Sequence, residues 1–183
     1  MSEEILIRQG APTLAGIKTG SLFPCPCEDR EALLSDIRQL NRRLSKKGLC
    51  LLPIRFLEGQ ALLYLYRPAE LRRDLQDVLA SELLRQAGYA DESCARCVAQ
   101  LIRRFRESGE FPHEVGLFLS YPPEDVKGFI DHRANGFKCA GLWKVYGDEA
   151  KAQALFAKFK KCTEIYCALW QTGSKLEQLA VAV

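Results

Sequence analysis

The chain has 183 residues and a formal net charge of +3, from 26 basic and 23 acidic side chains. Because this charge is small, it gives no support for binding to nucleic acid or to a membrane surface. Hydrophobic residues make up 48% of the chain and charged residues 27%, a composition that excludes a disordered protein. A chain of this length is expected to fold as one domain over residues 1–183.

The N-terminus and the cysteines indicate the cellular compartment. The first ten residues, MSEEILIRQG, have neither the basic start nor the apolar core of a secretory signal. No run of about 18 apolar residues predicts a membrane span. We therefore expect a cytoplasmic, cysteine-rich protein whose eight cysteines are free thiols.

The front half of the chain predicts a helix, the two strands of a hairpin and a second helix, over residues 29–47, 49–57, 61–67 and 68–86. Gly48 ends the first helix, and Gly59 lies in the turn between the strands. Because Pro53 has no N–H to donate, we expect the first strand at a sheet edge or at a bulge.

The back half predicts alternating helices and strands: helix 92–107 after a turn at Asp91, strand 115–119, helix 123–130, strand 139–146, and a long helix to about residue 170 with one more turn after it. Asp148 is a good N-cap for the long helix. A strand–helix–strand crossover makes its two strands parallel. The predicted fold is therefore α/β (α+β), a mixed sheet with a β-hairpin and a C-terminal parallel βαβα unit, with helices packed on the sheet.

Three segments are distinctive enough in combination to compare with known families. They are PTLAGIKTGSLF (12–23), HEVGLFLSYPPEDVKGFI (113–130) and GLWKVYGDEAKAQALFAKFKKCTEIY (141–166). Together they resemble DUF3793, a bacterial family of unknown function that occurs mainly in clostridia-like anaerobes. The resemblance spans nearly the whole chain, implies no established activity and names no cofactor.

The same resemblance implies a role in iron or redox physiology, because such genes are associated with flavodoxin and with ferrous-iron uptake. One departure concerns the residues before the Ala-Pro-Thr-Leu sequence. The family often has His-Cys there, whereas this chain has Gln9-Gly10 before Ala11. A metal or redox role that depends on that pair is weakened here.

The carboxyl ends of the two strands predicted to be parallel are the expected ligand site. These ends carry Ser120 and Tyr121 on one strand, and Tyr146, Gly147 and Asp148 on the other. A glycine allows close approach to the backbone, and the helix N-termini that follow attract anions. Acidic residues at both helix starts favour a cation or a neutral polar ligand over a phosphate, with capping of the helices as the alternative.

Two side chains near these strand ends are further candidates. His113 precedes the strand at 115–119, although a single histidine is more often structural than a ligand. Lys144 alternates with Trp143 on the last strand and is expected to project to the same side as Tyr146.

The segment 12–23 is polar and contains glycines. Thr13, Lys18 and Ser21 supply hydrogen-bond donors there, so we expect a binding loop near the strand ends. A helix capped by Gly20 is the alternative.

The cysteines offer two motifs. Cys94 and Cys97 form the only C-x₂-C pair, and both fall on the apolar stripe of helix 92–107, so core packing is favoured over a metal or redox role. Cys25 and Cys27 flank a proline in a predicted loop before a helix, where the helix N-terminus would stabilise a thiolate. The acidic residues that follow oppose that effect.

Three functions stay open on these observations. The first is a binding or accessory protein that holds a small ligand or a metal ion at the strand ends. The second is a thiol-dependent redox enzyme that uses Cys25 or Cys27. The third is an interaction module whose basic helix faces dock an acidic, flavodoxin-like redox partner. The sequence leaves the ligand, the cofactor and the oligomeric state open.

Overall fold

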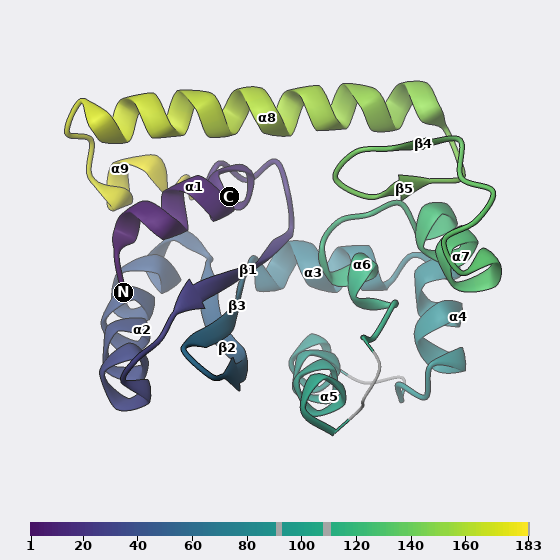
Figure 1. Ribbon diagram of the computed structural model, residues 1–183, viewed down its shortest axis with the longest axis horizontal. Coiled ribbons are helices and arrows are strands. Elements are labelled where there is room, and N and C mark those ends of the chain that lie inside the picture. The colour runs from purple at the N-terminus through teal and green to yellow at the C-terminus, as the bar shows by residue number, and fades with distance from the viewer. Residues whose placement is uncertain (91–92, 108–110, 183) are drawn as a thin grey trace. The chain divides into compact units, whose positions relative to one another are not determined.

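A computed structural model describes residues 1–90, 93–107 and 111–182 (Figure 1). It contains helices and two small antiparallel sheets, which confirms the predicted mixed α+β class. The chain divides into two compact units, Met1–Ala69 with Lys161–Val183, and Glu70–Lys160. The single domain expected from the length stays a prediction.

The first unit contains a three-stranded antiparallel sheet in the order β1-β3-β2. The strands are β1 (Gly20–Pro26), β2 (Cys50–Leu57) and β3 (Gln60–Tyr66). The β2–β3 hairpin was predicted, and so was the place of Pro53, because β2 is an edge strand whose register shifts between Pro53 and Arg55.

Strand β1 was not predicted. Of the segment 12–23, residues 12–14 end a helix over Glu3–Leu14 and residues 20–23 belong to β1, so the segment is neither a free loop nor one helix. The seven residues of β1 pair with β3 along their whole length, from Gly20 opposite Tyr66 to Pro26 opposite Gln60. Two prolines in the strand give it little local preference for this conformation. The extended conformation of β1 therefore depends on its pairing with β3, which is distant in the sequence. Such a pairing cannot be predicted from the residues of β1 alone.

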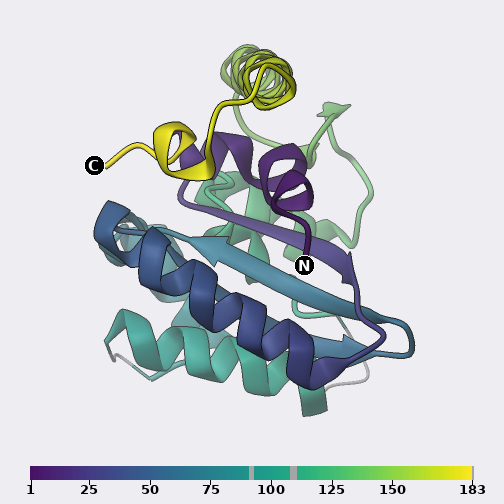
Figure 2. The same ribbon diagram turned by 90° about the vertical axis from the view of Figure 1, so that its left-hand side faces the viewer.

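Two helices pack on this sheet, α1 (Glu3–Leu14) against β1 and α2 (Arg30–Leu44) against β2 (Figure 2). Helix α2 begins where the sequence predicts, because Asp29 Oδ1 accepts from the backbone N–H groups of Glu31 at 2.8 Å and Ala32 at 3.2 Å. The buried side chains of both helices and the sheet form the core of this unit.

A buried arginine joins four segments of the first unit. Arg67 is 2% exposed, and its guanidinium donates to the carbonyl oxygens of Thr13, Leu14 and Val181 at 2.8 Å and of Lys47 at 3.1 Å. Burial lowers the pKa of Arg67 from its ordinary value. The charge is thus held by backbone dipoles, and the guanidinium supplies donors to carbonyls of three other segments of the unit.

The remaining elements are α3 (Pro68–Leu75), α4 (Val78–Gln86), α5 (Cys94–Glu107), α6 (Val115–Phe118), α7 (Pro123–His132), β4 (Cys139–Ala140), β5 (Lys144–Val145), α8 (Glu149–Gln171) and α9 (Leu176–Leu179). The single helix predicted at 68–86 is two helices, because Asp77 leaves the helical conformation and caps α4 with its side chain. The predicted turn residue Asp91 lies outside the described residues.

The predicted parallel βαβα unit is wrong. Residues 115–118 form the short helix α6, in which all four residues are buried. A short, fully apolar run fits a buried helix as well as a buried strand, so its pattern could not separate the two. The second predicted strand is the antiparallel hairpin β4–β5, with Cys139 opposite Val145 and Ala140 opposite Lys144.

Helix α5 begins at Cys94, two residues after the start of the predicted helix 92–107. The Ser93 carbonyl accepts from the backbone N–H groups of Arg96 at 2.8 Å and Cys97 at 3.1 Å, so Cys94 is the first helical residue. The C-x₂-C pair therefore lies in the first turn and not in a helix already under way. Cys97 is buried as predicted, whereas Cys94 is partly exposed.

Candidate functional site

The second unit contains a cavity of about 410 Å³ beside α6, α7 and the β4–β5 hairpin. Its lining is mostly apolar and aromatic. We call it the aromatic pocket and define it by Phe111, His113, Tyr121, Phe129, Trp143 and Lys144. All of these residues belong to Glu70–Lys160.

A stacked pair of rings forms one wall of the aromatic pocket. The rings of Tyr121 and Trp143 are 4.6 Å apart between centroids and inclined by 27°. Trp143 in turn meets the ring of Phe156 edge-on at 4.5 Å, and the Tyr121 hydroxyl donates to the Leu142 carbonyl at 3.3 Å. The wall is therefore fixed on both sides, and it presents flat aromatic surface.

Asp125 holds the hairpin against α7. Its carboxylate is 2% exposed, and Oδ2 accepts from Trp143 Nε1 at 2.7 Å. Oδ1 accepts from the backbone N–H groups of Tyr146 at 2.8 Å and Gly147 at 2.7 Å. Sequence reasoning missed this role, because an acidic residue in the first turn of a helix looks like an ordinary partner for the helix dipole.

Two basic side chains, His113 and Lys144, line the pocket together with the acidic Asp125. The His113 ring meets Phe129 edge-on, with 5.0 Å between ring centroids. Lys144 Nζ donates to the Ala134 carbonyl at 3.1 Å and lies 4.8 Å from the centroid of Phe137. Since an ammonium group has three N–H donors, the bond to Ala134 leaves donors for a ligand.

Two glycines allow the pocket walls to approach one another. A Cβ added at Gly116 would lie 2.7 Å from Val126 Cγ2, and one added at Gly141 would lie 2.3 Å from the Phe156 ring. These positions therefore require glycine for packing, and a side chain there would displace the residues that shape the cavity.

Not all the residues predicted at the strand ends reach this pocket. Tyr121, His113 and Lys144 line it, whereas Ser120 lines a separate cavity of about 440 Å³ that also includes Tyr121. Ser120 has a positive φ of 61°, which places its backbone in the left-handed region.

The three residues predicted at the other strand end have structural contacts. The Tyr146 hydroxyl is buried and has no hydrogen-bond partner within the described residues, and its ring stacks on His132 at 5.8 Å. Glu124 occupies the space beside Gly147, where an added Cβ would lie 2.6 Å from Glu124 Cγ. Asp148 caps α8 as predicted, because its Oδ1 accepts from the Lys151 N–H at 3.0 Å.

The candidates from the segment 12–23 belong to the first unit. Thr13 and Ser21 are both buried, and their hydroxyl oxygens are 2.9 Å apart in a mutual hydrogen bond. Burial lowers the pKa of Lys18 to about 8. The Thr13–Ser21 bond joins α1 to β1, which is a structural role.

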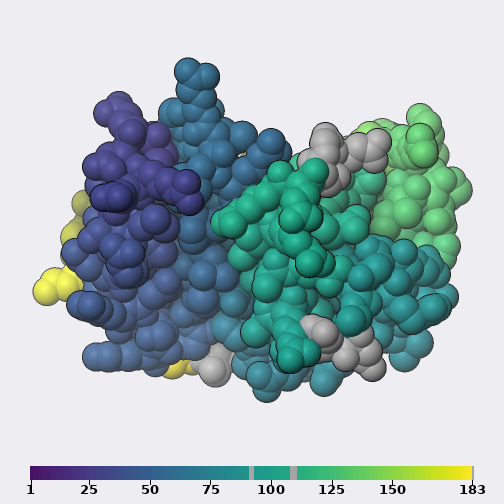
Figure 3. All heavy atoms as spheres, turned by 90° about the horizontal axis from the view of Figure 1, so that it is seen from below, coloured from purple at the N-terminus to yellow at the C-terminus, as the bar shows by residue number. Residues whose placement is uncertain are grey.

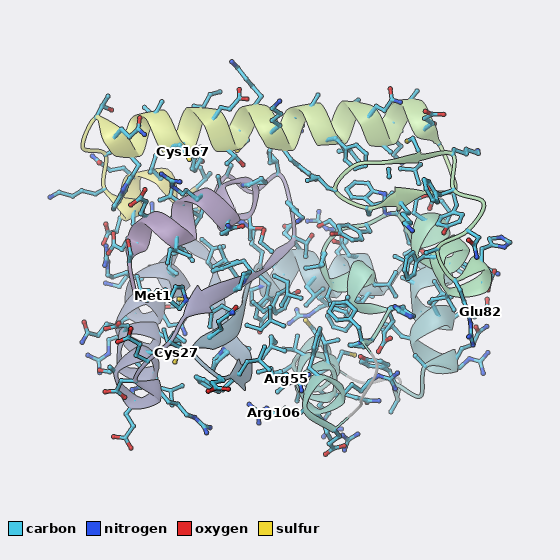
Figure 4. The ribbon with its side chains drawn as sticks, in the orientation of Figure 1. Met1, Cys27, Arg55, Glu82, Arg106 and Cys167 are labelled. Atoms are coloured by element: carbon cyan, nitrogen blue, oxygen red, sulfur yellow. The ribbon has the colours of Figure 1, made fainter. Side chains whose placement is uncertain are left out.

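The thiols of Cys25 and Cys27 differ in their surroundings. Cys25 is 1% exposed in the core of the first unit, and burial raises the pKa of its thiol. Cys27, labelled in Figure 4, lies just beyond β1 and is partly buried against the same core. The Cys25 surroundings thus disfavour the thiolate that nucleophilic chemistry needs.

The described residues contain neither a metal-ligand cluster nor a membrane-spanning helix. Residues 1–90, 93–107 and 111–182 contain no cluster of three or more His, Cys, Asp or Glu side chains that could hold a metal ion. Over the same ranges, no helix is long and apolar enough to cross a membrane.

Comparison with known proteins gives one relationship. No curated protein and no solved structure is detectably similar to this chain. A family model with the description "Protein of unknown function (DUF3793)" matches residues 6–180, which is nearly the whole sequence. The family suggested by the three sequence segments is therefore confirmed, and the chain belongs to DUF3793.

Proposed function

We propose that this protein binds a small, flat and largely apolar molecule in the aromatic pocket, and that the molecule carries an acceptor or anionic group. The observation that carries the proposal is a cavity of about 410 Å³ with an aromatic lining and two basic side chains. Small-molecule sites are typically cavities of roughly 300–1,000 Å³ with mostly apolar walls and a few polar groups.

The polar groups decide the class of ligand. Lys144 and His113 can donate hydrogen bonds, whereas both oxygens of Asp125 already accept bonds from N–H groups of the protein. Asp125 also lines the pocket, but three N–H donors of the protein already compensate its carboxylate, and Lys144 repels a cation. The pocket therefore favours a ligand with an anionic group or a neutral hydrogen-bond acceptor. The sequence had instead suggested a cation, because acidic residues begin the two helices.

The walls decide the shape of the ligand. The stacked rings of Tyr121 and Trp143 and the edge of Phe129 present flat surfaces, against which a planar ring system buries most apolar area. Because the rings are held by Asp125 and Phe156, little ordering is required when the ligand binds.

Three sequence predictions remain part of this proposal: a cytoplasmic location, an accessory role in iron or redox physiology, and the absence of nucleic-acid and membrane partners. Docking of an acidic flavodoxin-like protein and thiol chemistry at Cys25 or Cys27 stay alternatives. The burial of Cys25 argues against the second of these.

The proposal is tested by titration with 8-anilinonaphthalene-1-sulfonate, whose flat naphthalene ring carries an anionic sulfonate group. In a Trp170→Phe protein, Trp143 is the remaining tryptophan, since the chain has two. We expect saturable quenching of Trp143 with one probe bound per chain. No saturable quenching by a protein with a native circular dichroism spectrum would contradict the proposal.

Two lysine variants separate the pocket from general surface binding. Lys144→Gln should weaken binding of the anionic probe by about two- to fivefold, the effect of losing one partly exposed charge. It should leave the neutral analogue N-phenyl-1-naphthylamine unaffected. Lys127→Gln is the matched control, because Lys127 is an exposed lysine on α7 that pairs with Asp131 and does not line the pocket.

A further inference from the structure

The C-x₂-C pair at the start of α5 lines a second cavity of the same unit. This cavity has a volume of about 540 Å³, and we call it the thiol cavity, defined by Arg72, Ser81, Arg85, Ser93, Cys94 and Cys97. It is separate from the aromatic pocket, with which it shares no lining residue. The exposed side of α5 lies on the face shown in Figure 3.

Cys94 and Cys97 lie three residues apart in the first turn of α5. Residues three apart on a helix lie on one face with Cβ atoms roughly 5–6 Å apart, and a disulfide needs about 3.5–4.5 Å. The difference requires the turn that contains Cys94 and Cys97 to tighten. This is the first turn of α5, whose leading N–H groups have no partners within the helix, so tightening it breaks few bonds.

The exposure of the two thiols gives them different roles. Cys94 is partly exposed and can meet a molecule that enters the cavity, whereas Cys97 is only 7% exposed. Burial raises the pKa of the Cys94 thiol. The positive charge of Arg72 opposes this effect, because it favours the thiolate, but the effect of burial is larger. The resting state of Cys94 is therefore a neutral thiol.

Two arginines give the cavity its preference for anions. Arg72 and Arg85 both line it and are both exposed, and neither forms an ion pair with an acidic side chain in the described part of the chain. Their guanidinium groups are therefore available for the carboxylates of a small molecule.

We propose that Cys94 and Cys97 form a reversible dithiol–disulfide couple that exchanges with small anionic disulfides in the thiol cavity. Cys94 Sγ loses its proton and attacks one sulfur of the small disulfide, whose S–S bond breaks and releases a thiolate that takes up a proton. Cys97 Sγ then loses its proton, attacks Cys94 Sγ and releases the second small thiol. Two electrons and two protons pass from the cysteine pair to the small disulfide, which becomes two thiols.

The experiment incubates the whole protein with oxidised glutathione, a peptide disulfide that carries free carboxylates, and then alkylates the remaining thiols. Trypsin cleaves after Arg96, so a Cys94–Cys97 disulfide joins two peptides that mass spectrometry identifies. We expect these linked peptides in the wild type, a mixed disulfide at Cys94 in Cys97→Ser, and a reduced Cys97 in Cys94→Ser. Cys27→Ser is the control and should still give the linked peptides.

Arginine variants test the preference for an anionic substrate. Arg72→Gln should slow the reaction with oxidised glutathione by about two- to fivefold at low salt, and high salt should remove the difference. It should not slow the reaction with the neutral bis(2-hydroxyethyl) disulfide. Arg103→Gln, on α5 but outside the cavity, is the matched control.

Two results would overturn the proposal. The first is a Cys94–Cys97 pair that stays reduced while other cysteines of the same chain are modified. The second is an equal rate with oxidised glutathione for Arg72→Gln and Arg103→Gln. Neither result bears on the aromatic pocket, because no residue is common to the two sites.

Discussion

Replacing Asp125 by alanine should destabilise the second unit strongly. The carboxylate accepts three N–H groups, from the Trp143 indole and from the backbone of Tyr146 and Gly147, over 2.7–2.8 Å. Leaving one buried donor without a partner costs about 1–3 kcal/mol. Three such losses, partly relieved by water, give an expected decrease of about 3 kcal/mol or more in the free energy of unfolding.

Asp125→Asn separates geometry from charge. The asparagine oxygen can still accept from the Tyr146 and Gly147 N–H groups, but its NH₂ group would face the Trp143 Nε1 donor. One unsatisfied contact should cost about 1–3 kcal/mol, less than the alanine variant. Asp131→Asn, on the exposed side of the same helix, is the control and should change stability by less than about 0.5 kcal/mol.

The assay is urea unfolding followed through the Trp143 emission in a Trp170→Phe background. The two Asp125 variants should rank Ala below Asn below wild type. An Asp125→Ala protein within about 1 kcal/mol of the wild type would refute the account of how the hairpin is held. Binding of the anilinonaphthalene probe should weaken in the same order, because the Trp143 wall loses its anchor.

Three further perturbations test other parts of the chain. Arg67→Met removes the guanidinium donor from the Lys47 and Val181 carbonyls and one of two donors from the Thr13 and Leu14 carbonyls. It should lower the free energy of unfolding by about 2 kcal/mol or more, with Arg67→Lys intermediate, as measured by urea titration. Burial lowers the pKa of Lys18 to about 8, so between about pH 8 and 10.5 the unfolded chain binds one more proton at this side chain than the folded protein does. The free energy of unfolding of the wild type, relative to that of Lys18→Met, should therefore rise with pH over this window. A difference that stays constant with pH would contradict this prediction. Cys97→Ala should lower the free energy of unfolding by about 1 kcal/mol or more, because it leaves a cavity. Cys94→Ala should lower it less, because Cys97 is buried and Cys94 is partly exposed. Equal losses of stability in thermal unfolding would contradict this prediction.

Where one local signal suffices, the sequence predicts the structure well. The α2 start at Asp29, the β2–β3 hairpin, the irregular edge at Pro53 and the Asp148 cap all follow from chemistry within a few residues. Such features need no knowledge of distant contacts.

The features that escaped prediction depend on residues far away in the chain. Strand β1 exists because it pairs with β3, and α6 is helical in a run whose burial gives no periodicity. Asp125 accepts hydrogen bonds from residues in and just after the β4–β5 hairpin, which lie 18 to 22 positions later in the chain.

The candidate site was predicted in part, and for a reason that proved incorrect. His113, Tyr121 and Lys144 line one pocket although no parallel strands bring them together. Short connections through α6, α7 and the β4–β5 hairpin place them there instead. Tyr146, Gly147 and Asp148 were selected as strand-end residues, and they do follow β5, but that strand pairs antiparallel with β4 and these residues serve packing and capping.

The most direct test of ligand binding in the aromatic pocket is the nitrogen–proton NMR spectrum of the two tryptophan indoles during a titration with the anilinonaphthalene probe. Trp143 lines the pocket and donates to Asp125, whereas Trp170 lies in the other unit and serves as an internal reference. We predict that the Trp143 indole signal shifts and saturates while the Trp170 signal stays in place. If Trp143 does not respond, or if both signals shift together without saturation, the claim of a specific site is contradicted.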